Sequence, residues 1–487
     1  MIKTTLAIST TEIALMAVAF IRNKYLAIEI GPEGFGIYGL LHSFFTFVSL
    51  FSGAWLAGGA TKFISEYDEQ KDNIIVQKIS SLSIGLTFVI SLIITLIFII
   101  AQKPIRRIFL SEEVFSIYFT LFAVAFIGMS LRPIFIALLQ GLRQVKSVVF
   151  SRIVISAFEI ILVIILVYFF DLVGFFLSIL ITSVFALVFL WKQLKKNVRK
   201  FSFPKLNENI SQKLLFFGGS SLFLGLLLYG GEYSLRFIII KNIDITAIGL
   251  FQAAMALMGY LGILNRGAVF NFYTDISVVM DNINRTLKIN EYLRFVLLMN
   301  IPISVFAILS GKQIILLLFS SKFLPLSGIF FWFVLTHFMN SIAHVFHNNM
   351  KGMGLIKDFT FLGILGTFLL LIVPVIFIRE IGLSSVAIGY LLSYGGTIPI
   401  FYWYLNKKIN FRFSTLNLWL FFIAGLTLFG AILLMNNTFS LKFMWGIASL
   451  FLIGLTIKKD EYNKLFNFLL GRLNFINLKK SLRNECL

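Results

Sequence analysis

Long apolar runs alternate with short polar stretches from one end of the chain to the other. Each run covers about 20 residues or more, the helix length that spans a bilayer core of about 30 Å. About fourteen runs meet this criterion. They lie near residues 4–29, 35–60, 77–101, 114–139, 147–169, 172–195, 214–240, 245–271, 292–319, 325–349, 356–378, 382–405, 416–435 and 441–457. The pattern predicts an all-α polytopic membrane protein with about 14 transmembrane helices.

Several short sequences recur at a nearly constant spacing of about 210 residues. Gly36-Ile37-Tyr38 returns as Gly249-Leu250-Phe251, and segment 140–147 returns as 351–358. Two further pairs are Phe109-Leu110-Ser111 with Phe319-Ser320-Ser321, and Trp191 with Trp403. The repeat predicts two pseudo-symmetric six-helix lobes, and the last two runs have no counterpart. Duplicated halves of this kind build transporters with a binding site between them.

The repeat divides the chain into five predicted parts. The tail carries apolar residues at roughly helical spacing among lysines and arginines, which fits an amphipathic helix on the membrane surface, and equally a frayed basic tail. The parts are an N-terminal six-helix lobe (1–196), a cytoplasmic linker (197–213), a C-terminal six-helix lobe (214–410), two extra helices (411–457) and a basic cytoplasmic tail (458–487).

Composition and charge narrow the class of protein. Apolar residues make up 59% of the chain and the mean hydropathy is +0.93, which excludes a soluble globular protein. The net charge of +20 does not indicate nucleic-acid binding, because most lysines and arginines fall in loops on one side of the predicted membrane. This asymmetry is the positive-inside rule and predicts cytoplasmic termini in a multi-pass cell (inner) membrane protein. The single cysteine, Cys486, excludes a disulfide framework.

Several cations fall within the predicted spans. A charge at the bilayer centre costs about 2.5–3.5 kcal/mol on insertion scales, so each one needs a reason. The candidates for lining a substrate cavity are Arg22, Lys24, Lys62, Arg132, Arg236 and Arg266. Arg22, Lys24 and Arg266 lie near enough to helix ends to snorkel, and Lys62 fits a helix end. Arg132, closer to mid-span, favours a water-filled cavity, and the adjacent Pro133 predicts a kinked or unwound helix.

A smaller set of buried titratable residues forms the candidates for ion coupling. They are Glu12, Glu159, Glu232, His337 and His344. Glu232 stands one helical turn from Arg236 and is expected to pair with it, whereas Glu159 has no partner nearby in sequence. His337 and His344 belong to a polar stripe along residues 337–351 that occupies one helix face. The stripe fits a proton relay, but hydrogen-bonded packing around the cavity is the favoured interpretation.

Signatures of catalysis or of a bound cofactor do not occur in the sequence. It has no phosphate-binding glycine-rich loop followed by Lys-Ser/Thr and no His-Glu-x-x-His pair. No cysteine or nearby carboxylate completes a metal site around the histidines. Glu112-Glu113 fits a solvated loop better than a catalytic pair. We therefore expect neither enzymatic activity nor a cofactor, and a membrane glycosyltransferase or polymerase would need a larger loop with clustered acids.

Four motifs resemble those of one transporter family. Segment 26–38, which contains Gly31-Pro32-Glu33-Gly34, resembles the opening of Wzx-type polysaccharide flippases of the multidrug/oligosaccharidyl-lipid/polysaccharide (MOP) superfamily. Segment 58–67 resembles that family's end of helix 2, and segments 249–252 and 318–323 resemble the second-half counterparts. The resemblance extends over essentially the whole chain, and its motifs identify the superfamily better than the substrate.

The resemblance implies a substrate, a mechanism and partners. The substrate is a polyprenyl-diphosphate-linked oligosaccharide, moved from the cytoplasmic to the outer leaflet for surface polysaccharide synthesis, with O-antigen as the expected example. Family members use alternating access, often with ion coupling, around a cationic cavity between the lobes. Membrane lipids, a polysaccharide polymerase and other assembly proteins are the expected partners. An apolar groove framed by the last two helices would hold the lipid tail.

Three alternatives stay open from the sequence. The first is an ion-coupled multidrug exporter of the same superfamily, although such exporters generally have twelve segments and acidic cavities. The second is a major-facilitator transporter, whose usual motif between segments 2 and 3 is missing. The third is a non-transporting scaffold, which would leave the buried charges unexplained.

Overall fold

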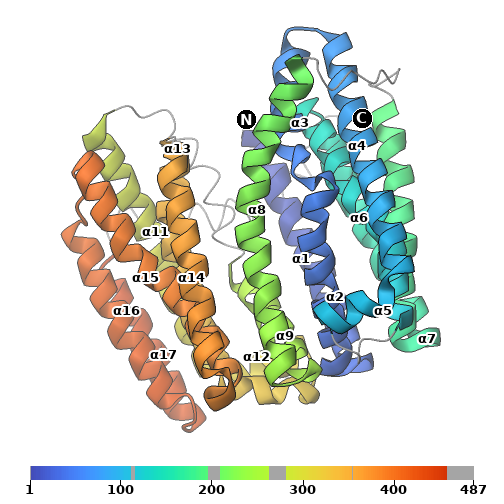
Figure 1. The fold of residues 1–487 in the computed structure, drawn as a ribbon. Helices are drawn as coiled ribbons and strands as arrows, with labels where there is room; N and C mark the ends of the chain where they lie inside the picture. The colour runs from blue at the N-terminus through green and yellow to red at the C-terminus, as the bar shows by residue number, and fades with distance from the viewer. Residues whose placement is uncertain (1, 111–115, 196–208, 263–280, 354, 458–487) are drawn as a thin grey trace, which may run out of the picture.

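The computed structural model describes residues 2–110, 116–195, 209–262, 281–353 and 355–457, and these are almost entirely helical. The helices form two bundles, here called the N-lobe and the C-lobe, that converge toward one end (Figure 1). The N-lobe consists of α1 (Ile2–Glu29), α2 (Gly31–Ser49), the π-helical η1 (Leu50–Ala54), α3 (Leu56–Glu69), α4 (Asn73–Ile100), α5 (Gln102–Ile105), the π-helical η2 (Arg106–Leu110), α6 (Ser116–Gly141) and α7 (Val145–Lys195). The C-lobe consists of α8 (Asn209–Asn242), α9 (Ile245–Leu261), α11 (Asn282–Leu309), α12 (Gly311–Leu318), the 3-10 helix η3 (Ser321–Gly328), α13 (Phe330–Gly352), α14 (Ile356–Ile381) and α15 (Leu383–Ile409), with α16 (Thr415–Leu434) and α17 (Phe439–Gly454) added.

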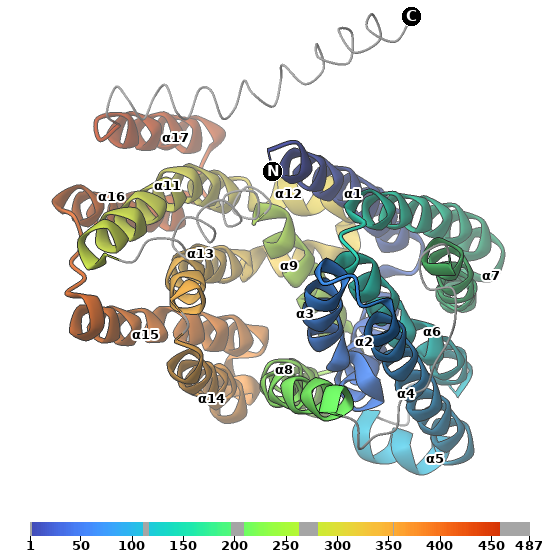
Figure 2. The ribbon, with the colours of Figure 1, turned by 90° about the horizontal axis from the view of Figure 1, so that it is seen from above.

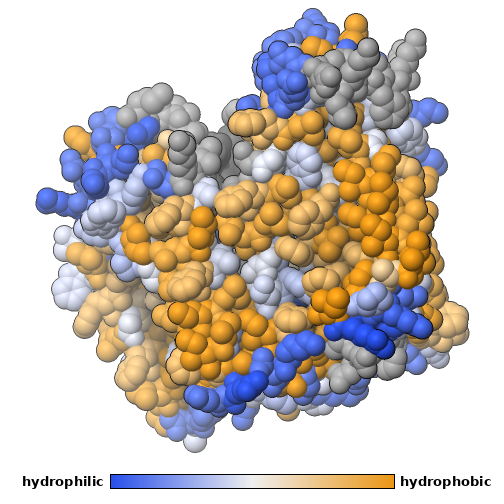
Figure 3. All heavy atoms as spheres, in the orientation of Figure 1, coloured by the Kyte–Doolittle hydropathy of each residue, from blue (hydrophilic) through white to orange (hydrophobic). Residues whose placement is uncertain are grey.

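A broad apolar band crosses the face seen in Figure 3, with polar residues gathered above and below it. Eight of the described helices are long and apolar enough to cross a membrane, and a ninth span is possible if the pair Ser321–Gly328 and Phe330–Met350, bent by 68°, is counted as one. The chain is therefore a multi-span membrane protein. Helix α17, with 16 residues, is short for a bilayer core of about 30 Å. The total of fourteen crossings stays a prediction.

Helix α7 contains two of the predicted segments, and these form a helical hairpin. Asp171 has φ +47° and breaks the helix between the predicted segments 147–169 and 172–195. The two arms pack against each other, as the stacked rings of Phe158 and Phe185, 4.0 Å apart, demonstrate.

A break that the sequence analysis did not predict lies in segment 2. Gly53 has φ +115° within η1, where a Cβ atom would come 2.3 Å from Thr87 Oγ1 on α4. Glycine tolerates both this backbone conformation and this close approach. Helix α6, in contrast, continues through Pro133 from Ser116 to Gly141, so of the kinked or unwound helix expected there the unwound form is wrong, and the kink stays a prediction.

The two lobes meet where α1 ends and α2 begins, here called the closed end, at the bottom of Figure 1. Helix α2 packs along α9 so tightly that a Cβ atom on Gly36 would lie 1.9 Å from the Ile245 carbonyl oxygen. A Cβ on Gly249 would lie 1.8 Å from the Pro32 carbonyl oxygen. The repeated Gly36 and Gly249 motifs therefore face each other, and close backbone approach explains why both copies carry glycine.

Helix α8 links the lobes, and Figure 2 shows it between the two groups of helices. Its last half packs in the C-lobe against α9 and α14, while its first half lies on η1 and α3 of the N-lobe. Gly218 contacts the Trp55 ring there, and Gly225 contacts Leu50. Because α8 packs on both lobes, any change in their relative angle must bend it or slide it.

The two unrepeated helices attach to the C-lobe through a buried amide network. Asn417 on α16 donates to the Asn290 side-chain oxygen on α11 at 3.0 Å, and the Ser414 amide donates to the same atom at 2.9 Å. Asn290 in turn donates to the Arg412 carbonyl oxygen at 2.9 Å. Among the described residues the Asn417 side-chain oxygen has no hydrogen-bond partner, but the other amide groups of the network join α16 directly to α11.

Candidate functional site

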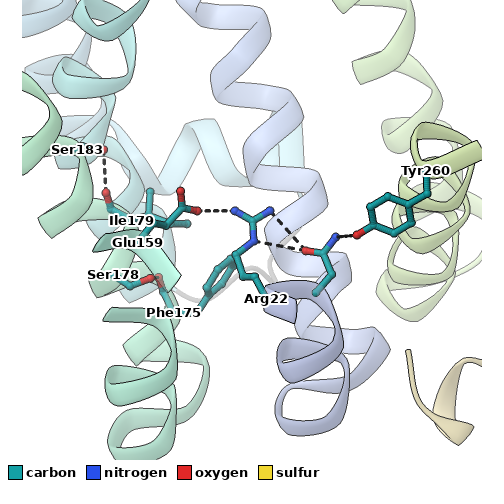
Figure 4. Close-up of polar contacts among 8 residues, drawn as sticks. Arg22, Glu159, Phe175, Ser178, Ile179, Ser183 and Tyr260 are labelled. Carbon is teal, nitrogen blue, oxygen red and sulfur yellow. Dashed lines mark hydrogen bonds and ion pairs between the residues drawn. The ribbon is translucent and has the colours of Figure 1, made fainter. Parts of the chain in front are cut away.

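Arg22 lies on α1 about two turns from the closed end and points toward α7 (Figure 4). Its Nη1 forms an ion pair with Glu159 Oε1 on α7, and the side chains are 26% and 21% exposed. Its Nε and Nη2 face the Asn23 side-chain oxygen, each at 3.4 Å. Glu159, for which the sequence offered no partner, is thus held by a cation 137 positions away in the chain.

Asn23 extends this cluster across to the C-lobe. Its Nδ2 donates to the Tyr260 hydroxyl on α9 at 2.9 Å. The Tyr260 ring also meets Phe20 edge to face, with centroids 6.4 Å apart. The guanidinium of one lobe is therefore connected to the wall of the other through a single amide.

Helix α2 separates Arg22 from a second arginine in the corresponding place of the C-lobe. Arg236 precedes the Gly249 motif by nearly the same distance as Arg22 precedes the Gly36 motif. His42 on α2 lies within electrostatic reach of both arginines. The Tyr38 ring lies next to it, with centroids 5.3 Å apart. The lobe contact is thus surrounded by polar groups of both halves.

Arg236 itself is buried, with 5% of its surface exposed. Its Nη2 donates to Gln252 on α9 at 2.8 Å, and its guanidinium lies over the Phe251 ring at 5.1 Å. Its Nη1 is 3.8 Å from Glu232, as the one-turn spacing predicted. Most of its surface is covered by these neighbours, so Arg236 is less accessible to a ligand than Arg22.

Arg132 on α6 lies near the Glu159 carboxylate, which pairs with Arg22. It is half-buried and lies within electrostatic reach of Glu159, Arg152 and Arg22. Three arginines, Arg22, Arg132 and Arg152, therefore lie in this cluster with one acid, Glu159. Such an excess of positive charge is suited to an anionic ligand.

The other predicted cations lie outside this cluster or outside the described residues. Lys24 binds the carbonyl oxygens of Leu316, at 2.7 Å, and Phe319, at the C-terminal end of α12. There it joins the lobes at the closed end, where a cation complements the helix dipole. Lys62 is exposed on α3, with its ammonium 4.8 Å from the Phe217 ring of α8. Arg266 lies outside the described residues.

The predicted coupling residues are distributed over different places. His337 is buried on α13, with Nε2 3.2 Å from the Asn300 side-chain oxygen on α11. His344 is exposed, and its ring centroid lies 5.8 Å from that of His347. Glu12 belongs to α1, but its side chain is outside the described part. The role of these residues in ion coupling stays a prediction.

Sequence reasoning missed the uncharged members of the cluster. They are Asn23, Tyr38, His42, Gln252 and Tyr260. The available signal was their position, because Tyr38 and His42 stand one turn apart on a span whose other polar residues are serines and a threonine, and Asn23 lies between two cations. Buried polar groups inside membrane helices need partners, and here those partners come from other helices.

A hollow of about 830 Å³ lies beside the cluster, between α9, α11, α12 and α17. Tyr260 forms part of its wall, next to Leu257 and Leu261. Phe306 of α11 and Phe443 of α17 line it and are nevertheless 64% and 59% exposed, so the hollow opens on the outer surface of the bundle. The lining is apolar apart from a few side chains. Within the described ranges, no group of three residues suited to hold a metal occurs.

Comparisons with known proteins agree with this architecture. A family model described as "Polysaccharide biosynthesis protein" matches residues 1–264. The chain is 21% identical over 356 residues to the lipid III flippases of Escherichia coli (strain K12) and Shigella flexneri, covering 71% of this chain and 83% of each relative. Its fold is similar to that of lipid II flippase MurJ in an inward closed conformation, with TM-score 0.72, 16% identity, and coverage of 96% of this chain and 100% of that chain. An inward-facing MATE family multidrug resistance transporter of the MOP superfamily is also similar, with TM-score 0.71, 16% identity, and coverage of 81% and 94%. The relatives are flippases and transporters rather than enzymes.

Proposed function

The chain belongs to the polysaccharide biosynthesis protein family, and on that premise we propose that it flips a polyprenyl-diphosphate-linked oligosaccharide from the cytoplasmic to the outer leaflet. One observation carries the proposal: the cationic cluster around Arg22 and the apolar hollow share Tyr260. A lipid-linked glycan has a diphosphate directly attached to a long apolar tail. The two sites are adjacent in the way that such a molecule requires.

The diphosphate is assigned to Arg22, with Arg132 nearby. A guanidinium can bind phosphate oxygens through two parallel hydrogen bonds, and these charge-assisted bonds are stronger than neutral ones. Asn23 and Tyr260 add a hydrogen-bonding edge beside the guanidinium. Arg22 is therefore the residue on which we expect binding to depend most.

The polyprenyl tail is assigned to the hollow between α11 and α17. A polyprenyl chain that remained in contact with lipid while its head group entered the protein would need an apolar passage open to the bilayer. The exposed wall residues Phe306 and Phe443 supply that opening. The two helices without a repeat partner would then exist to complete the lipid-binding side of the C-lobe.

Transport would proceed by alternating access around the contact between α2 and α9. With both termini cytoplasmic, as the charge pattern predicts, the lobes are joined at the outer side and diverge toward the cytoplasm. The names of the lipid III and lipid II flippases describe the same class of lipid-linked glycan. A surface polysaccharide such as O-antigen, with its polymerase as a partner, is the extension of this proposal.

The test is flipping of a lipid-linked oligosaccharide in proteoliposomes, followed by cleavage of exposed glycan from outside. Replacing Arg22 by Ala should lower the initial rate about ten- to hundredfold, the loss expected for charged hydrogen bonds of about 1.5–3 kcal/mol. Arg143→Ala is the matched control, because it removes an exposed ion pair with Glu69 of the same chemistry. Equal rates in both variants, at equal abundance, would contradict the proposal.

The second candidate function is ion-coupled multidrug export, which the similarity to the MATE family fold supports. Its discriminating assay uses the same vesicles with a cationic dye and an imposed ion gradient. Dye transport without glycan flipping would favour the exporter. The excess of arginines near Glu159 argues for an anionic ligand instead.

A further inference from the structure

We propose that Glu159 is an internal substitute for the substrate's diphosphate: it occupies Arg22 before substrate binds, gives way to the diphosphate, and returns to Arg22 to expel it. This inference rests on the proposed flippase function and adds a residue that controls release. It makes Glu159 a positioning residue, which acts through Arg22 rather than by touching the substrate.

The geometry of the ion pair supports exchange. Within the described part of the chain, the contact joins a single guanidinium nitrogen, Nη1, to a single carboxylate oxygen. Among the described residues, the hydrogen-bond contacts of the Nε and Nη2 edge are to Asn23, each at 3.4 Å, which is long for a hydrogen bond. A guanidinium bound through one nitrogen still offers its two-pronged edge to a phosphate. An incoming diphosphate can therefore bind that edge first and displace Glu159 afterwards.

A second cation lies near Glu159 and can act as its counter-ion once Arg22 has released it. Arg132 of α6 and Tyr38 of α2 both lie within electrostatic reach of Glu159. A carboxylate released by Arg22 would stay near Arg132 and not be left without a counter-ion. Leaving a charge unpaired in such a half-buried place is costly, so the second arginine makes the displacement feasible.

The same exchange explains how a tightly held anion could be released. A site with several arginines and no internal acid would bind a diphosphate well in both the inward-open and the outward-open form of the protein. Equal affinity in the two forms does not speed turnover. When Glu159 competes for Arg22, the affinity of the site is lowered and the product leaves. The ion pair thus lowers the affinity for the diphosphate and raises the rate of its release.

The experiment measures binding of geranylgeranyl diphosphate and flipping by the full-length protein carrying Glu159→Gln. Glutamine keeps the shape but not the charge, so it should compete weakly for Arg22. We expect the dissociation constant to fall by about tenfold, in the range of typical coupling between competing ligands. The flipping assay should show a lower KM and a lower kcat together, because release becomes slow. A merely structural role would lower kcat without tightening binding.

Two further variants make the outcome decisive. Glu69→Gln is the matched control, since it breaks an exposed Arg–Glu pair and should leave both measurements unchanged. Glu159→Asp keeps the charge on a shorter side chain and should give a dissociation constant between those of the wild type and the glutamine variant. If the glutamine variant folds poorly, the comparison of Glu159→Asp with the wild type still tests the inference. Unchanged or weaker binding in both Glu159 variants would overturn the inference. If Arg22→Ala nevertheless lowered the flipping rate as expected above, the proposed function would survive that result.

Discussion

A methyl group placed on Gly36 should push the two lobes apart at the closed end. The Cβ of Gly36→Ala would lie 1.9 Å from the Ile245 carbonyl oxygen, and that backbone atom belongs to a helix start that cannot rotate away like a side chain. Ordinary contact distances require α9 to retreat by about 1 Å or more. Overpacking of this kind costs about 1–3 kcal/mol. The cost falls only on the form in which α2 and α9 touch.

The expected consequence is a shift in the population of the two transport forms. A penalty of about 1–3 kcal/mol corresponds to a 5- to 150-fold change in the equilibrium between them. The form joined at the closed end should lose population, and the transport rate should fall because one half of the cycle is disfavoured. Gly249→Ala, with its Cβ 1.8 Å from the Pro32 carbonyl oxygen, should act in the same direction.

The assay is a distance distribution between spin labels at Glu33 and Ile243, both at the closed end, in a Cys486→Ser background that removes the single native cysteine. The matched control is Gly425→Ala on α16, where a new Cβ meets nothing within 4 Å. The control carries the same small gain in helix propensity. An unchanged distance distribution and transport rate in Gly36→Ala would refute the reasoning that this contact holds the lobes together.

Three further predictions concern topology, the hollow and coupling. Reporter fusions after Lys205 should read cytoplasmic and fusions near Glu112 external, and the reverse would overturn the charge-based topology. Gly446→Trp, which adds a ring at a position with open space in the wall of the hollow, should slow flipping of a long-chain substrate several-fold. It should leave binding of inorganic diphosphate unchanged, and equal loss of both would argue against a tail site. With an imposed pH or sodium gradient, wild-type transport should respond to the gradient, and the response should weaken in Glu159→Gln or His344→Ala. Gradient-independent wild-type transport would remove the idea of ion coupling.

The elements of the fold could be predicted from the sequence because they depend on local properties. A run of apolar residues long enough to span lipid is expected to be helical wherever it lies, and the described parts of the predicted runs are helical, although the run 35–60 is broken at Gly53 and the run 292–319 is divided between α11 and α12. The repeat of the Gly36 and Gly249 motifs predicted two related halves, because similar local sequences form similar helices. The cost of burying a charge in lipid also singled out Arg22 and Arg132 without any knowledge of their neighbours.

What only the tertiary structure decided is the identity of those neighbours. The sequence specified that Arg22 and Glu159 are charges in apolar spans, but pairing depends on how α1 and α7 are rotated and which faces they present to each other. The same holds for Lys24, which binds the end of α12 and not the ligand cluster, and for the hollow, which is assembled from four helices. Helix formation is determined by hydrogen bonds within each segment, whereas the rotation and contacts of helices are determined by packing between segments far apart in the chain.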